Sequence, residues 1–238
     1  MSGLSQFKIK LYADGANLQD MIEEYENGIV SGFTTNPTLM KKAGVKNYAE
    51  FAKAAINAIP DLPISFEVFS DDLFGMECEA RKIANWGKNI YIKIPVTNTK
   101  GESTVPLIMK LSHEGLKLNV TAILTLDQVK TIAVAISKDT SSIVSVFAGR
   151  IADTGRDPMP IMRESAKILK SNPKVELLWA STREILNISQ AELCGCHIIT
   201  IPNDILKKVP QVGKDLDLVS IETVKDFYTD AQNAGYRI

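Results

Sequence analysis

The chain alternates between two patterns of hydrophobic and polar residues along its whole length. Short runs rich in valine, isoleucine and phenylalanine, typical of buried β-strands, are followed by longer stretches in which apolar residues recur every three or four positions, as in amphipathic helices. The predicted strands cover residues 7–13, 30–35, 64–69, 90–96, 116–122, 141–148, 175–181 and 197–202. The predicted helices cover residues 18–27, 48–59, 72–86, 101–113, 126–137, 158–169, 182–192, 203–208 and 220–234.

Eight strand–helix units in 238 residues match a parallel (β/α)₈ TIM barrel in number and length. An open, doubly wound α/β sheet usually has fewer strands and carries a glycine-rich phosphate turn after its first strand, whereas the sequence here continues as DGANL. No linker divides the chain, so we predict one domain over residues 1–238. Residues 125–127 offer a helix cap, and we expect the additional C-terminal helix, at about 220–234, to begin at Ser220.

Composition and charge narrow the class of protein. The chain is 45% hydrophobic and 23% charged, as is ordinary for a soluble enzyme. Its net charge of −1 gives no electrostatic reason for a nucleic acid or a membrane to be a partner, and no apolar run reaches the roughly 20 residues of a membrane span. Cys78, Cys194 and Cys196 follow no zinc or haem spacing, and with no secretion signal we expect a cytoplasmic protein with reduced thiols. His113 and His197 lie far apart without companion ligands, so we expect no metal.

Lys93 interrupts the apolar run IYIKIPV at 90–96. A lysine in a strand buried on both faces must leave a strongly hydrated ammonium in a poor solvent or lose its proton. A neutral amine is a nucleophile toward carbonyl groups, which is the first step of Schiff-base catalysis. The alternative is that the side chain reaches solvent at the strand mouth or pairs with a carboxylate. The other strands must decide between these interpretations.

Polar residues recur where the predicted strands end, which is where active sites of (β/α)₈ barrels lie. Single positions have ordinary explanations: Asp14 fits an Asp-Gly turn, Asn36 an Asn-Pro turn and Ser181 a helix cap. Glu67 and Asn119, however, interrupt apolar strands, and buried polar groups need partners. A shared polar ligand explains the whole set, which comprises Asp14, Thr34, Asn36, Glu67, Lys93, Asn119, Thr121, Ser145, Arg150, Ser181 and Arg183.

The residue types in this set fit one kind of chemistry. Lys93 is an amine nucleophile, and Asp14 and Glu67 are candidate proton carriers. Amides suit sugar hydroxyls, and paired arginines suit a phosphate through charge-assisted hydrogen bonds. We therefore predict an amine catalyst for a phosphorylated polyol ketone.

At these positions the chain resembles the transaldolases. The resemblance rests on YADGANL at 12–18, GFTTNPTLM at 32–40, YIKIPVT at 91–97, LNVTAILTLDQ at 118–128, SVFAGRIADTGRD at 145–157, LLWASTRE at 177–184 and ITIPNDIL at 199–206. It implies a (β/α)₈ enzyme of the pentose phosphate pathway that needs no cofactor. Such an enzyme moves a dihydroxyacetone unit from a ketose phosphate, sedoheptulose 7-phosphate or fructose 6-phosphate, to an aldose phosphate.

The resemblance also implies residue roles. Lys93 corresponds to the Schiff-base lysine and Asp14 to the carboxylate that moves the hydroxyl proton during carbon–carbon cleavage. Glu67 and Thr121 correspond to the pair that positions the water of imine formation and hydrolysis. The implied binding residues are Asn36 and Asn119 for the dihydroxyacetone unit, Thr34 and Ser145 for the lining of the site, and Arg150, Ser181 and Arg183 for the substrate phosphate.

Two other functions stay open. Fructose-6-phosphate aldolase is a short-chain relative that releases free dihydroxyacetone; there the strand-three glutamate is replaced by glutamine, the strand-five asparagine by an apolar residue, and a tyrosine on strand six transfers the proton. Glu67, Asn119 and Phe147 stand at those positions here and favour transaldolase. The second alternative is a barrel repurposed to bind a sugar phosphate. In the short relatives a C-terminal helix packs on a neighbouring subunit, so we expect a homo-oligomer, with pentamers and decamers as precedents.

Overall fold

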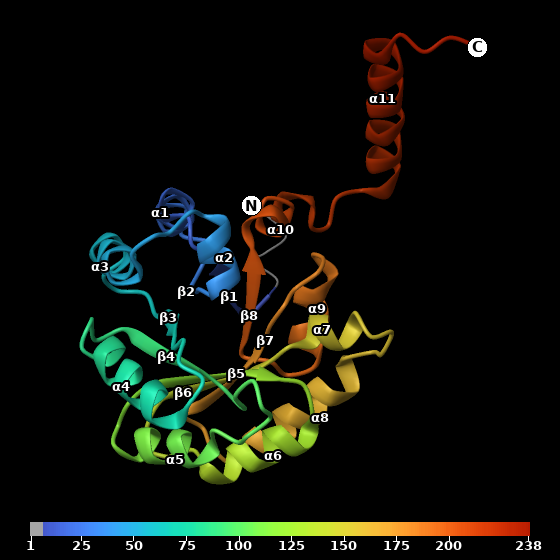
Figure 1. Ribbon diagram of the computed structural model, residues 1–238. Helices are drawn as coiled ribbons and strands as arrows, with labels where there is room; N and C mark the ends of the chain where they lie inside the picture. The colour runs from blue at the N-terminus through green and yellow to red at the C-terminus, as the bar shows by residue number, and fades with distance from the viewer. Residues whose placement is uncertain (1–6) are drawn as a thin grey trace.

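The eight predicted strands form one closed parallel barrel (Figure 1), in a computed structural model that describes residues 7–238. Each strand pairs in parallel with the next, and the last pairs with the first. The strands are β1 (Lys10–Asp14), β2 (Gly32–Thr34), β3 (Ile64–Glu67), β4 (Ile90–Pro95), β5 (Leu118–Ile123), β6 (Ser142–Val146), β7 (Val175–Trp179) and β8 (Ile198–Pro202). The prediction of a (β/α)₈ barrel is confirmed. That residues 1–238 form one domain stays a prediction, and residues 1–6 lie outside the described range.

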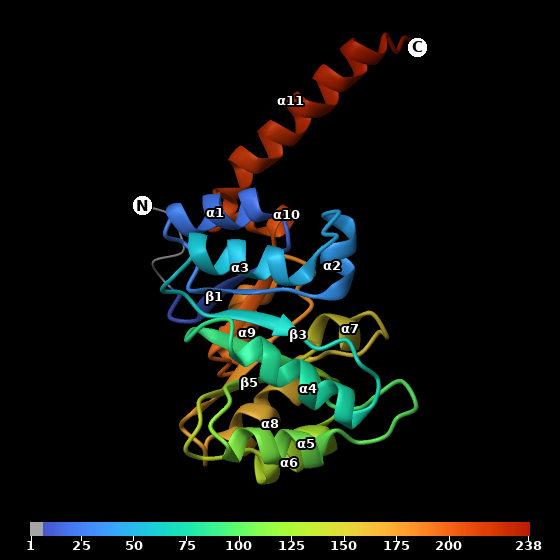
Figure 2. The same cartoon turned by 60° about the vertical axis from the view of Figure 1, so that its left-hand side comes forward.

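Helices follow the strands, and all except the last lie around the outside of the barrel (Figures 1 and 2). They are α1 (Leu18–Glu26), α2 (Pro37–Lys42), α3 (Tyr48–Ala58), α4 (Leu73–Ala84), α5 (Val105–His113), α6 (Leu126–Ala135), α7 (Ala148–Ala152), α8 (Met159–Leu169), α9 (Leu186–Leu193), α10 (Asn203–Leu206) and α11 (Leu216–Ala234).

The strand alternation separates two hydrophobic layers. Side chains such as Val144 and Val146 of β6 pack in the large core between strands and helices, while Ile143 packs with Tyr12 and Leu178 in a smaller cluster inside the barrel. A Cβ atom at Gly32 would lie 2.6 Å from the Tyr12 ring, so the strand beside this tyrosine needs a glycine. The cluster around Tyr12 fills the interior of the barrel with apolar side chains. The polar side chains of the strands lie beyond it, at the carboxyl ends of the strands.

Several element boundaries differ from the predictions. The short helices α2 and α7 were not predicted. For α2 the reason is that Asn36-Pro37 has the sequence of a turn, whereas in the structure Asn36 caps a helix with proline in its first turn. Helix α5 begins four residues later than predicted, after Gly101 at a φ of +79°. Helix α9 likewise begins after a longer loop than predicted. The predicted cap at residues 125–127 is confirmed: Thr125 and Gln128 form a reciprocal capping box.

The predicted start of the last helix at Ser220 is wrong. Helix α11 begins at Leu216, because the Asp215 side chain accepts a hydrogen bond from the Leu218 amide at 3.0 Å and Asp217 adds a negative charge to the first turn. Gly235, at a φ of +67°, ends the helix. In both views α11 extends away from the barrel (Figures 1 and 2), and none of its residues is buried.

Candidate active site

The predicted polar residues meet around one cavity of about 740 Å³ at the carboxyl ends of the strands. Every candidate residue lines this cavity except Asn119, which is fully buried on β5. Parallel pairing explains the convergence: Glu67 of β3 lies opposite Lys93 of β4, and Lys93 lies opposite Asn119. The sequence prediction of where these residues meet is therefore correct, while the role of each stays a prediction.

Lys93 is both buried and paired with a carboxylate, and its role as a nucleophile stays a prediction. Lys93 is 6% exposed, and its Nζ donates a hydrogen bond to the Thr35 carbonyl oxygen at 3.0 Å. The Glu67 Oε2 atom lies 3.2 Å from the same nitrogen. A buried ammonium needs such partners, and the carboxylate is also the nearest group able to accept a proton from it. The amine and the carboxylate thus share one edge of the cavity.

Asp14 faces the cavity from the end of β1. Its cross-strand partner Thr34 donates a hydrogen bond to Asp14 Oδ1 at 2.8 Å. Burial raises the pKa of the Asp14 carboxyl above its ordinary value, and the charge of Lys93 and hydrogen bonding to Thr34 and Asn36 oppose that rise. A carboxyl with a raised pKa releases and accepts a proton closer to neutrality, which suits a proton carrier.

Asn119 is held from both sides. Its Nδ2 donates to the Ser65 Oγ atom at 3.0 Å, and its Oδ1 accepts from the Ser145 Oγ atom at 2.7 Å. These contacts fix the orientation of the amide beneath the cavity. The sequence analysis missed Ser65, although it lies two positions before Glu67 and therefore on the same face of β3.

A β-bulge sets the direction of Thr121. The pairing of β5 with β6 shifts between Val120 and Ile123, so Thr121 and Ala122 together oppose Ser145. Ala122 has a φ of 58°, in the left-handed region. The Thr121 Oγ1 atom is buried and has no hydrogen-bond partner among the described residues. A buried hydroxyl without a partner costs about 1–3 kcal/mol, so this group is suited to hold a water or a substrate hydroxyl.

Basic side chains gather across the cavity, where the chain leaves β6 and β7. A Cβ atom at Gly149 would lie 1.6 Å from the Ser181 carbonyl oxygen, so only glycine allows α7 to approach this loop. The approach brings Arg150 and Ser181 to the same wall. Ser181 itself has a φ of 67°.

Arg183 carries a carboxylate partner that the sequence analysis missed. Its Nε and Nη2 donate to the two oxygens of Asp153 at 3.0 and 2.6 Å. These bonds lower the pKa of Asp153 and raise that of Arg183. They also fix the plane of the guanidinium, whose remaining donors can reach an anion.

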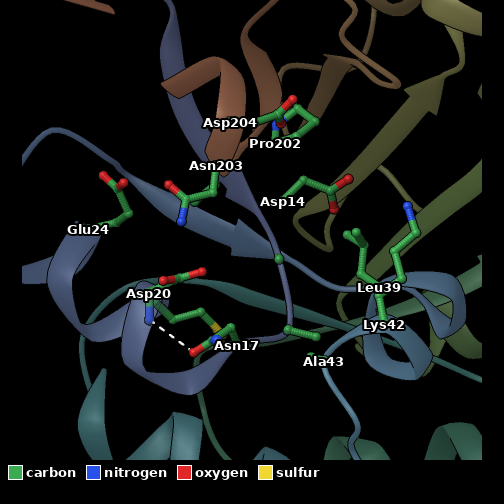
Figure 3. A pocket seen from close by; sticks show the side chains of 14 residues that line it. Asp14, Asn17, Asp20, Glu24, Leu39, Lys42, Ala43, Pro202, Asn203 and Asp204 are labelled. Atoms are coloured by element: carbon green, nitrogen blue, oxygen red, sulfur yellow. Dashed lines mark hydrogen bonds between the residues drawn. The ribbon is translucent and has the colours of Figure 1, made fainter. Parts of the chain in front are cut away.

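A second cavity of about 320 Å³ adjoins the first on the side of α1 and α10 (Figure 3). Asp14, Leu39, Lys42 and Pro202 line both cavities and so separate them. Figure 3 shows the Lys42 side chain on the same side of the smaller cavity as Asp14. Lys42 adds a cation to the wall opposite the arginines; the sequence analysis missed it because it lies in the unpredicted α2.

Two kinds of feature are absent from residues 7–238, a metal-binding cluster and a membrane-spanning helix. No group of three or more histidine, cysteine, aspartate or glutamate side chains there could hold a metal ion. No helix in this range is long and apolar enough to cross a membrane.

Comparison with known proteins gives a consistent picture. Residues 11–237 match the model of a family described as transaldolase/fructose-6-phosphate aldolase. A "probable transaldolase" of Thermoanaerobacter sp. (strain X514) is 37% identical over 231 residues, covering 97% of this chain and 100% of the relative. One from Caldicellulosiruptor saccharolyticus is 37% identical over 203 residues, covering 84% and 89%. Dihydrodipicolinate synthase from Rhodopseudomonas palustris shares the fold, with a TM-score of 0.56 at 13% identity over 94% of this chain and 79% of that one.

Proposed function

The chain belongs to the transaldolase/fructose-6-phosphate aldolase family, and from this premise we propose that it is a transaldolase acting on sugar phosphates. The observation that carries the proposal is the buried Lys93 amine, which has Glu67 at 3.2 Å and opens onto the cavity shared with Asp14 and the arginines. An amine, two proton carriers and an anion site in one enclosure are the parts that a Schiff-base transfer of a ketose phosphate requires.

The reaction begins with imine formation. The neutral Lys93 amine attacks the ketose carbonyl, and the adduct loses water to give a cationic imine. Glu67 supplies and removes the protons of this step, since its carboxylate lies beside the amine. Thr121, with its unpartnered hydroxyl, holds the water that leaves and later returns in hydrolysis.

Carbon–carbon cleavage follows from the electron demand of the imine. Asp14 removes the proton of the hydroxyl on the carbon beyond the bond that breaks, and the electron pair of that bond moves to the imine nitrogen. The first aldose leaves as its aldehyde, and the dihydroxyacetone unit remains on Lys93 as an enamine. The enamine then attacks the aldehyde of the acceptor, Asp14 returns the proton, and hydrolysis frees the product.

The remaining residues orient the substrate. Asn36 holds the hydroxyls of the dihydroxyacetone unit, with Thr34 and Ser145 beside it, and Asn119, buried beneath the cavity, orients Ser145. Arg150, Ser181 and Arg183 bind the phosphate at the opposite wall, and Phe147, whose ring lies 5.8 Å from the Arg150 guanidinium, lines the same cavity. We infer that the sugar chain lies across the mouth, with its carbonyl at Lys93 and its phosphate at the arginines.

Aldol cleavage with release of dihydroxyacetone is less favoured. Glu67 and Asn119 occupy the positions that differ in the aldolase, and Phe147 offers no hydroxyl for proton transfer. A barrel that only binds a sugar phosphate is also less favoured, since it would have no use for a buried lysine beside a carboxylate.

Borohydride reduction in the presence of fructose 6-phosphate tests the function. We expect peptide mass spectrometry to find the adduct on Lys93, because hydride reduces an imine to a stable amine. Adding erythrose 4-phosphate without borohydride is then expected to give sedoheptulose 7-phosphate. Free dihydroxyacetone as the main product would instead indicate an aldolase, and no adduct on Lys93 would rule out the Schiff base.

We also propose that the enzyme is a homo-oligomer assembled through α11. The helix presents a stripe of apolar side chains, Leu218, Ile221, Val224 and Tyr228, that are 54%, 50%, 63% and 67% exposed. Such a stripe on a helix of 19 residues with no buried residue favours a protein partner. Pentamers and decamers are the expected assemblies.

The three cysteines, all within residues 7–238, are free thiols, which supports a reducing cytoplasmic location.

Charge placed on this stripe is expected to dissociate the assembly. The double variant Ile221→Glu, Val224→Glu should elute as a 26.1 kDa monomer in size-exclusion chromatography with light scattering, whereas the wild type should be several times larger. Thr229→Glu with Asn233→Glu adds the same charge to the face of α11 that carries Glu222 and Asp226 and should leave the assembly intact. A wild type of 26.1 kDa would contradict the proposal.

A further inference from the structure

Asp14 is the end of a chain of hydroxyl groups that crosses the barrel mouth. Thr34 donates to Asp14 Oδ1 at 2.8 Å, and the Thr34 and Thr200 Oγ1 atoms lie 2.5 Å apart. Thr34 belongs to β2 and Thr200 to β8, the two strands that flank β1. Both threonines are buried, at 3% and 5% exposure. Three adjacent strands therefore contribute to one hydrogen-bonded line.

The direction of this line follows from counting protons. A threonine hydroxyl has one proton to donate, and an ionised carboxylate can only accept. Because Thr34 gives its proton to Asp14, its contact with Thr200 must be one in which Thr200 donates. The order is Thr200 to Thr34 to Asp14 Oδ1.

The same count distinguishes the two oxygens of Asp14. A proton on Oδ1 would force Thr34 to turn its own proton toward Thr200. The Thr200 hydroxyl would then need a new acceptor, and among the described residues its only hydrogen-bond partner is Thr34. A proton on Oδ2 leaves the line unchanged, since Oδ2 takes no part in the contacts of Thr34 and Thr200.

We propose that Thr200 is a positioning residue that acts through Thr34, holding Asp14 Oδ1 as an acceptor so that Oδ2 exchanges the proton with the substrate hydroxyl. This inference rests on the proposed function. In the cleavage step the hydroxyl proton passes to Oδ2, the carbon–carbon bond breaks, and its electron pair goes to the imine nitrogen; the reverse transfer serves the acceptor aldehyde.

The backbone at Thr200 is itself fixed by the loop that carries the anion site. Thr182 Oγ1 donates to the Thr200 carbonyl oxygen at 2.7 Å, and Thr182 lies between Ser181 and Arg183. A rigid anchor matters because a proton carrier has to be held within about 0.5 Å of its working position.

Other charged groups face Asp14 and contribute to its titration. Lys93 lies on β4, Glu67 on β3 and Lys42 on α2, and Arg150 and Arg183 line the far wall of the same cavity. The smaller cavity adds carboxylates of α1 and α10, which are Asp20, Glu24 and Asp204. A test of Thr200 must therefore change its hydroxyl without changing any charge.

Thr200→Val removes the hydroxyl at nearly constant volume, and Thr200→Ser keeps it. We expect Thr200→Val to lower kcat about tenfold, with the donor KM within about twofold, since Thr200 acts through Asp14 and positioned acid–base groups contribute 10²–10⁴-fold. The acid limb of the pH profile should move upward by about half a unit to one unit, because Thr34 is then free to turn and accept a proton from Oδ1, which makes the protonated carboxyl easier to form. Thr200→Ser should restore both quantities.

Thr140→Val is the matched control, since it removes a buried hydroxyl that donates to the Ser112 carbonyl oxygen, away from the site. A Thr200→Val enzyme with the wild-type acid limb would overturn the proposal. Borohydride trapping separates this outcome from a failed function: Thr200→Val should still form the Lys93 adduct, whereas a wild type without the adduct would refute the transaldolase. If valine prevents folding, Thr200→Ala makes the same comparison.

Discussion

Replacing Lys93 by alanine is expected to lower the rate of transfer by a factor of about 10⁴ or more, because the other lysine that lines the cavity, Lys42, is exposed on α2 and does not have Glu67 beside it. The variant should give no borohydride adduct with fructose 6-phosphate. Rate and adduct are measured on the same preparation, after circular dichroism has shown that the barrel is folded.

Two further variants make this result specific. Lys93→Met retains the length of the side chain, so the loss should persist although the packing is kept. Lys117→Ala removes a lysine whose Nζ donates to the Lys88 carbonyl oxygen, outside the cavity, and should leave the rate near that of the wild type. Turnover by Lys93→Met within tenfold of the wild type would contradict the Schiff-base mechanism.

Replacing Asp14 by asparagine is expected to lower the rate of carbon–carbon cleavage about 10²–10⁴-fold, because the amide cannot take up the hydroxyl proton. Imine formation does not need this carboxylate, so the borohydride adduct on Lys93 should still appear. A variant that loses the adduct as well would show that Asp14 acts earlier than proposed.

The same substitution is expected to stabilise the fold in a pH-dependent way. Burial raises the pKa of Asp14 in the folded state, so the folded protein binds this proton more tightly than the unfolded chain. The stability that follows from this proton is fully present below the ordinary value of 3.8 and is lost as the pH rises through the raised value. Asp14→Asn has no such loss, so its advantage over the wild type should be larger at pH 7 than at pH 4. Urea unfolding at both pH values measures the difference, and an equal difference at both would contradict the raised pKa.

The sequence predicted the strands and the residues at their ends because both follow from local rules. A polar residue inside an apolar strand, such as Glu67 or Lys93, is conspicuous in one dimension, and parallel strands bring their carboxyl ends together. The barrel and the set of residues around its mouth could be predicted on these grounds alone.

What the sequence did not reveal are partners whose residue types are ordinary where they stand. Ser65 and Thr200 lie in apolar strands, and threonine is a common strand residue, so neither marks a site. Asp153 pairs with Arg183 across 30 positions, and only the approach of α7 to the β7 loop joins them. Hydrogen-bond partners of this kind become visible only when the strands are placed side by side.

The bulge of β5 matters to anyone who would graft this catalytic set onto another barrel. Side chains of a regular strand alternate, so a regular β5 would turn Ile123 into the barrel after Asn119 and Thr121. The extra residue Ala122 lets Thr121 stay inward while Ile123 packs outward in the core. A recipient barrel with a regular fifth strand therefore cannot accept these side chains by substitution alone. It requires a one-residue insertion, and with it the left-handed backbone at that point.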